Sequence, residues 1–183
     1  PHTNLPAIKN PHPVCDCARY ELVNVAGAAN VPAIDAMTLN YPTPLHRDKD
    51  LSESQKNENR TKILGALKEV FDDAQHAISL GMSGKWVGHP LQLLMVMAAF
   101  REAVPAKQIE KDIREIEAYT KSVHAGAGAT VMGEGADAYM ADRATDRHLR
   151  ARLRRATAWR RIDAARAHAL GVITDAELQE LQG

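Results

Sequence analysis

The chain has 183 residues, a formal net charge of +0 and 45% hydrophobic residues. This length suits one domain with a small appendage, and the apolar content is sufficient for a core. A balanced charge argues against a general binder of nucleic acid or membrane surfaces. No apolar run approaches the ~20 residues that span a bilayer, and the N-terminus has no signal-peptide pattern. We therefore expect a cytoplasmic protein with neither a nucleic-acid nor a membrane partner.

The N-terminal part of the chain passes from a loop to a helix and then to a strand. Residues 1–13 contain four prolines, which predicts an extended loop and hints that the chain starts in the middle of a larger fold. Residues 15–29 have helical spacing, so Cys15 and Cys17 point to different sides and are expected to stay reduced. The nearly continuous apolar pattern of residues 31–39 predicts a strand of a parallel sheet buried on both faces.

A second strand and two helices are expected after a long polar loop over residues 40–54. Ser52 and Gln55 have the spacing of a capping box. The elements predicted after it are a helix over 59–80, a strand over 85–87, a break at 88–90 and a helix over 91–102. This alternation indicates βα units around a parallel sheet. Two strands do not make a stable parallel sheet alone, so the others must come from an upstream part of the chain or from another polypeptide.

From Pro105 onward the pattern becomes mainly helical. An amphipathic helix is predicted up to His124, followed by a Gly/Ala-rich segment for which a short hairpin is one interpretation. Further helices are predicted over 143–156 and 159–170, with a last short one ending at 181. Thr174 and Glu177 have the spacing of a second capping box. We therefore expect one domain over residues 1–104 and a helical C-terminal extension over 105–183.

Two residues in the first domain are candidates for a functional site. His89 follows the second predicted strand, in Gly-His-Pro. It either bonds a substrate carbonyl or phosphate, or caps the next helix. Asp35 lies in an apolar strand, where a carboxylate must be paired, hydrogen-bonded or metal-bound. It either orients a ligand or metal, or is a core carboxylate satisfied by backbone amides. No two histidines share one helix face at metal-ligand spacing, so we expect no histidine metal site.

The extension contains acidic and basic candidates. Asp137, Asp142 and Asp146 lie just before or within a basic helix, where negative charge complements the helix dipole. The eight arginines between residues 143 and 161 point in many directions around their helices. A solvated or oligomer-facing surface is the default interpretation, and a phosphate-binding patch is the sharper one.

Three stretches resemble a known family of aldolases, the citrate lyase β-subunit-like and malyl-CoA lyase-like enzymes. They are GMSGKWVGHPLQL, VPAIDAM and GAGATVMGEGADAYMADRATDRHLRAR. Their order and spacing agree with the family over essentially the whole chain. The resemblance implies an α/β fold, namely the C-terminal βα units of a TIM (β/α)8 barrel followed by a helical extension. It also implies cleavage or formation of a carbon–carbon bond between an acyl-CoA and a 2-oxo acid, usually with Mg²⁺.

The resemblance also assigns roles to residues. Asp142 matches the aspartate that the extension delivers to a neighbouring subunit, with Asp137 as the fallback if the register differs. His89, Pro90 and Gln92 match a loop near the CoA side of the barrel mouth, and Asp35 matches a strand aspartate. A homo-oligomer, a trimer or hexamer, is implied because the aspartate acts in trans.

The chain departs from the family in what it lacks. The family's metal-binding Glu and Asp and its catalytic arginine lie on earlier strands, so no metal ligand is expected here and Mg²⁺ would be held upstream of this chain. Gly88 stands where the family usually has Ile or Val. We therefore expect the last two βα units of a lyase for 3-hydroxyacyl-CoA esters such as malyl-CoA or citramalyl-CoA. The rival interpretations are a metal-dependent aldolase for free 2-oxo acids and a non-catalytic assembly or regulatory chain with an incomplete barrel.

Overall fold

The computed structural model describes residues 12–29 and 31–183, so most of the predicted N-terminal loop lies outside the described residues. The chain forms two compact units, Pro1–Ala103 and Val104–Gly183, and each is described by itself. Within the described helices, none is both long and apolar enough to cross a membrane.

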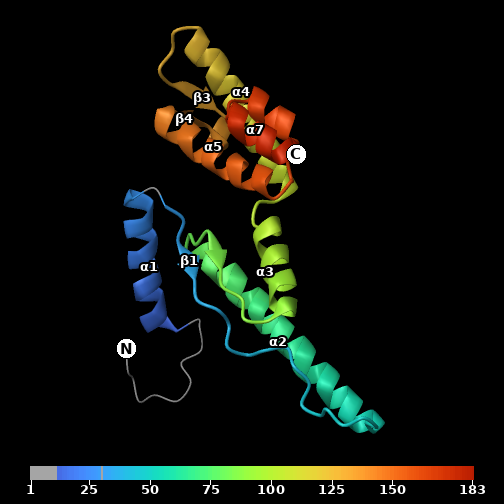
Figure 1. The fold of residues 1–183 in the computed structure, drawn as a ribbon. Helices are drawn as coiled ribbons and strands as arrows, with labels where there is room; N and C mark the ends of the chain where they lie inside the picture. The colour runs from blue at the N-terminus through green and yellow to red at the C-terminus, as the bar shows by residue number, and fades with distance from the viewer. Residues whose placement is uncertain (1–11, 30) are drawn as a thin grey trace. The chain divides into compact units, whose positions relative to one another are not determined.

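The first unit begins with helix α1 (Pro13–Ala28), as the sequence predicts. His12 caps it: its Nδ1 accepts the backbone N–H of Val14 at 3.2 Å, and Pro13 occupies a first-turn position where no N–H is needed. The C-terminal end of α1 is anchored because Ala26 is buried in a small apolar cluster with Ala33, Ala77 and Met82. Figure 1 shows α1 beside β1.

The two strands of the first unit are parallel, as predicted, but shorter than predicted. Strand β1 (Ile34–Asp35) pairs with β2 (Gly84–Lys85), with Asp35 opposite Lys85. The predictions of strands over 31–39 and 85–87 are therefore wrong in extent. Pro32 has no N–H to donate to a ladder, which stops β1 on its N-terminal side. Beyond Asp35 the next carbonyl, that of Ala36, accepts a hydrogen bond from the Lys85 ammonium at 2.7 Å.

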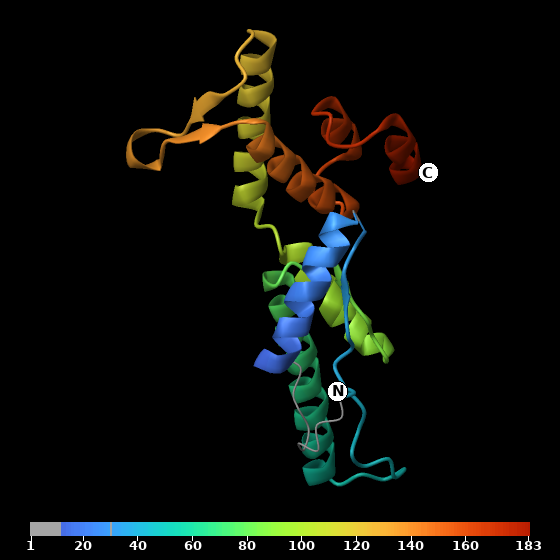
Figure 2. The same cartoon turned by 90° about the vertical axis from the view of Figure 1, so that its left-hand side faces the viewer.

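Helices α2 (Glu53–Ser79) and α3 (Pro90–Glu102) pack against one another beside this strand pair, as Figures 1 and 2 show. The capping box of Ser52 and Gln55 is confirmed, and for that reason α2 begins six residues before the predicted start. Small buried side chains let the helices approach closely. They include Ala66, Ala74 and Ala77 on α2 and Ala99 on α3.

The second unit is mainly helical and contains one hairpin. Its elements are α4 (Ala106–His124), β3 (Thr130–Met132), a 3-10 turn η1 (Gly135–Asp137), β4 (Tyr139–Ala141), α5 (Arg143–Ala158), α6 (Ala164–Ala169) and α7 (Asp175–Gln182). The antiparallel β3–β4 pair confirms the predicted hairpin. The capping box of Thr174 and Glu177 is also confirmed. The helix predicted over 159–170 is wrong at its start, because Arg160 has a φ of 53° and Asp163 caps α6.

Apolar side chains from four helices form the core of the second unit. Ile113 and Ile116 of α4 and Leu153 of α5 are almost completely buried, and Ala167 of α6 packs with them. Leu178 and Leu181 of α7 pack against this core from its edge. The core fixes α4 and α5 side by side, and the hairpin connects these two helices in the chain.

Candidate functional site

The segments that follow β1 and β2 are joined by one buried side-chain amide, that of Gln92. Gln92 Oε1 accepts the backbone N–H of Gly88 at 2.9 Å, and Nε2 donates to the carbonyl of Thr38 at 2.9 Å. Gln92 is 1% exposed; its bond to Thr38 is buried, and its bond to Gly88 is partly buried. Carboxyl ends of neighbouring parallel strands are where α/β proteins place ligands. The first candidate site therefore lies at this end of the strand pair.

His89 is the N-cap of α3, which is the structural role weighed for it above. Its Nδ1 accepts the backbone N–H of Leu91 at 3.2 Å, and Pro90 occupies the first turn. In a neutral ring whose Nδ1 accepts, the proton is on Nε2. The half-buried ring is therefore fixed by its cap bond, and its Nε2–H is available as a donor to a ligand oxygen.

Asp35 is a core carboxylate paired with two cations. Arg19 Nε donates to its Oδ1 at 2.7 Å, and Lys85 Nζ donates to its Oδ2 at 2.8 Å. In the part of the chain that the structure describes, side-chain cations are therefore its partners, and not the backbone amides of one interpretation given above. Burial alone would raise the pKa of Asp35, but the hydrogen bonds and charges of Arg19 and Lys85 outweigh it and hold the pKa below its usual value. With a cation on each oxygen, this carboxylate does not fit a metal ligand.

The sequence interpretation missed both cationic partners of Asp35. Arg19 is 7% exposed in α1, and the Lys85 side chain is 0% exposed in β2. A signal existed for Lys85, because a lysine inside an otherwise apolar strand must find an anion. For Arg19 the flanking residues gave no comparable signal, since charged residues are ordinary on an exposed helix face.

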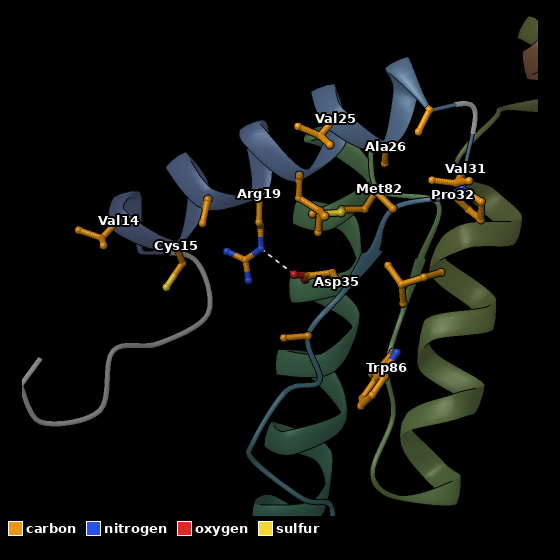
Figure 3. A pocket seen from close by; sticks show the side chains of 16 residues that line it. Val14, Cys15, Arg19, Val25, Ala26, Val31, Pro32, Asp35, Met82 and Trp86 are labelled. Atoms are coloured by element: carbon orange, nitrogen blue, oxygen red, sulfur yellow. Dashed lines mark hydrogen bonds and ion pairs between the residues drawn. The ribbon is translucent and has the colours of Figure 1, made fainter. Parts of the chain in front are cut away.

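An apolar groove of about 930 Å³ runs between α1 and β1 (Figure 3). Its volume falls within the range of roughly 300–1,000 Å³ that is typical of small-molecule sites. Most of its lining is apolar, and the Arg19–Asp35 ion pair is the main polar feature drawn in Figure 3. Trp86, 68% exposed, lines the groove and lies on the segment that leads to His89. The apolar residues lining it include Val14, Leu22, Val25, Val31, Ile34 and Met82.

Asp142 is the N-cap of α5 and stands where the hairpin ends. Its Oδ1 accepts the backbone N–H groups of Ala144 at 2.9 Å and Thr145 at 3.0 Å, and also the Thr145 hydroxyl at 3.3 Å. The backbone bond from Thr145 contributes most to lowering the pKa of Asp142 below its usual value. Asp142 is exposed, and none of these three bonds uses Oδ2, so an ionised oxygen can face a ligand.

A partly buried polar cluster supports the hairpin strand that leads to Asp142. The Tyr139 hydroxyl interacts with Glu115, and burial together with this carboxylate raises the pKa of Tyr139 to about 12. Nearby, Arg152 Nη2 donates to the fully buried carboxylate of Asp112 at 2.6 Å. Helix α4 supplies Glu115 and Asp112, so the end of the hairpin is tied to a helix of the core.

The other acidic and basic candidates of the extension are mostly structural. Asp146 pairs with Arg150 at 2.8 Å within α5, and Arg154 pairs with Glu177 of α7. Together with Asp112, these carboxylates pair with three of the eight arginines that were considered as a phosphate-binding patch. Asp137, the fallback for Asp142, belongs to the turn η1, and its side chain lies outside what the structure describes.

Among residues 12–29 and 31–183, no three His, Cys, Asp or Glu side chains are grouped so that they could hold a metal ion. His89, Pro90, Gln92 and Asp35 belong to the first unit and Asp142 to the second, so each group of candidates is described within its own unit. No protein-family model, curated protein or solved structure matches the chain.

Proposed function

We propose that this chain is the C-terminal part of a carbon–carbon lyase that cleaves or forms a 3-hydroxyacyl-CoA ester such as malyl-CoA or citramalyl-CoA. One observation carries the proposal: the segments VPAIDAM and GKWVGHPLQ pair as parallel strands, and Gln92 joins the loops at their carboxyl ends. These are two of the stretches that resemble the citrate lyase β-subunit-like and malyl-CoA lyase-like family. Such ends of parallel strands are where barrel enzymes bind ligands.

In this proposal the first unit binds and positions the thioester. The Nε2–H of His89 donates to a carbonyl or phosphate oxygen of the substrate, and Gln92 holds the loop that carries His89. Pro90 sets the start of α3, which keeps the cap bond of His89 in place. Asp35 acts indirectly, by neutralising Lys85 and Arg19 beneath the site.

Asp142 is the proposed proton-transferring group. The backbone bond from Thr145 lowers its pKa below an ordinary value that already leaves it ionised at neutral pH, so in the resting enzyme it accepts a proton rather than donates one. We propose that it serves the site of a neighbouring subunit in a cytoplasmic homo-oligomer, a trimer or hexamer. The resemblance places the Mg²⁺ ligands outside this chain, so the proposal assigns no step to the metal.

The test uses the full-length enzyme that contains this chain. Asp142→Asn is expected to abolish cleavage of malyl-CoA while leaving the affinity for Mg²⁺ unchanged. Full lyase activity in Asp142→Asn would refute the role of Asp142. Assaying malyl-CoA beside free hydroxy-oxo acids separates a CoA-ester lyase from a metal-dependent aldolase for free 2-oxo acids, because the latter would cleave only the free acids.

A non-catalytic assembly or regulatory chain with an incomplete barrel is the second candidate. It is favoured by the pairing of Asp35, whose two oxygens are both occupied by cations. It predicts that the full-length protein cleaves neither the thioester nor the free acid with Mg²⁺ present. Turnover of either substrate would eliminate it.

A further inference from the structure

Tyr41 packs directly over Gly88, the residue before His89. A Cβ placed on Gly88 would lie 2.6 Å from the Tyr41 hydroxyl oxygen and 2.8 Å from the edge of its ring. At separations this short one of the two groups must shift, and the atoms concerned are at the far end of the Tyr41 side chain, which is 38% exposed. The Tyr41 hydroxyl in turn donates to the sulfur of Met37 at 3.5 Å. The space of a side chain at position 88 is therefore occupied by residues from the segment after β1.

The backbone conformation at position 88 does not require a glycine, so the relevant feature of Gly88 is the absence of a side chain. Five glycines of the described chain have a positive φ, at positions 81, 126, 133, 135 and 171, and Gly88 is not among them. An L-residue could adopt its backbone conformation, so a side chain at position 88 would need only Tyr41 and Met37 to move aside. The contact also joins two segments that lie 47 positions apart in the sequence, at the same place where Gln92 joins them.

We propose that Tyr41 is a positioning residue for His89: its ring fills the place of the missing side chain at position 88 and fixes the loop that presents His89 Nε2–H. Gln92 holds the backbone of this loop by accepting the N–H of Gly88. Tyr41 holds it by packing, so the two restraints are of different kinds. The inference rests on the proposed function only where it states that His89 contacts the substrate.

The test exchanges bulk between the two positions in the full-length enzyme. The variants are Tyr41→Ala, Gly88→Val, and the two combined, with Tyr41→Phe as a control that keeps the ring and loses the hydroxyl. If Tyr41 stands in for a side chain at position 88, the valine of the combined variant restores the lost packing. The flexible thioether of Met37 can yield to it.

The first readout is the tautomer of His89, which is monitored by NMR of the imidazole nitrogens at a pH where the ring is neutral. The starting protein and Tyr41→Phe should show the proton on Nε2. Tyr41→Ala should show exchange between the two tautomers, and the combined variant should restore the Nε2–H form. An unchanged tautomer in Tyr41→Ala, or no recovery in the combined variant, overturns the inference.

The second readout is the kinetics with malyl-CoA. A residue that positions a group for binding changes KM more than kcat. We expect KM to rise about ten-fold in Tyr41→Ala with kcat within about two-fold, and to recover in the combined variant. A fall of kcat with KM unchanged overturns the positioning role. Absence of turnover in every protein, the starting one included, refutes the proposed function instead, while the NMR result still decides the role of Tyr41.

Discussion

The backbone N–H of Thr145 donates to Oδ1 of Asp142 across 3.0 Å, so the carboxylate proposed for proton transfer also begins helix α5. The capping bonds all reach Oδ1, so the proposed proton transfer would use Oδ2. Stability and activity should therefore respond differently to substitutions at this position.

Asp142→Ala should lower the thermal midpoint of the second unit by about 5 °C, because a lost N-cap weakens the helix. Asp142→Asn should keep nearly the full midpoint, since asparagine is an equally good cap, yet lose lyase activity. The matched control is Asp163→Ala, which removes the cap of α6 in the same unit and should lower the midpoint with activity retained. Equal losses of midpoint in the Asn and Ala variants would argue against capping as the source of the stability that Asp142 contributes.

The ion pair between Asp35 and Lys85 should contribute strongly to the stability of the first unit. Asp35→Asn leaves the completely buried Lys85 without its anion, and breaking a buried pair in this way costs about 3 kcal/mol. Urea unfolding measures it. Lys68→Ala is the control, because Lys68 pairs with Asp72 on the exposed face of α2 and should change stability by less than about 0.5 kcal/mol. Similar effects of the two substitutions would contradict a strong contribution of the buried Asp35–Lys85 pair to stability.

Combining Asp35→Asn with Lys85→Met tests the same pair in a second way. Methionine removes the buried charge while keeping a long side chain, so the combined variant should be more stable than Asp35→Asn alone. If the two losses simply added, Lys85 and Asp35 would not be coupled.

The pKa of Asp35 is lower in the folded protein than in the unfolded chain, where it is near 3.8. Its contribution to stability is therefore complete above the unfolded pKa and is lost as the pH falls through the folded pKa. We expect the free energy of unfolding to be nearly flat with respect to Asp35 above about pH 5 and to fall below about pH 4. Urea unfolding over this range should show a shallower acid dependence for Asp35→Asn. Identical slopes would contradict the lowered pKa.

For Tyr139 the predicted dependence of stability on pH has the opposite sign. Its pKa is raised to about 12, first by burial and then by Glu115, so the neutral phenol is favoured in the folded protein. The stability that depends on it is complete below the unfolded pKa near 10 and is lost as the pH rises toward about 12. Tyrosinate absorbance should therefore show a late step that Tyr139→Phe removes. A step that survives this substitution would have to come from another tyrosine.

The helices could be predicted from the sequence because their signals are local. Ser52 with Gln55 and Thr174 with Glu177 are three residues apart, and both capping boxes are confirmed. The parallel pairing of the strands was also predicted, but their lengths were not. Apolar composition marks residues 31–39 as buried, yet Pro32 and the loop after Asp35 limit the ladder to two residues.

The contacts that define the candidate site could not be predicted in the same way. Arg19 is 16 residues from Asp35, and Lys85 is 50 residues from it, so no spacing rule relates the three. The approach of Tyr41 to Gly88 is also non-local, although the glycine itself was noted as unusual. Local sequence patterns predicted where the loops lie. The residues that contact one another across these loops are set by the tertiary structure.

The Arg19–Asp35–Lys85 cluster has a consequence for how the chain reaches its fold. A parallel ladder of two residues contains too few hydrogen bonds to select one alignment of β1 on β2. A slip by one residue would set Ile34 against Lys85 and turn Asp35 to the opposite face. The fully buried ammonium of Lys85 would then lose its carboxylate, and Arg19 would keep Asp16 but lose Asp35. The charges thus discriminate against misaligned strands during folding, a selectivity that apolar side chains alone would not provide.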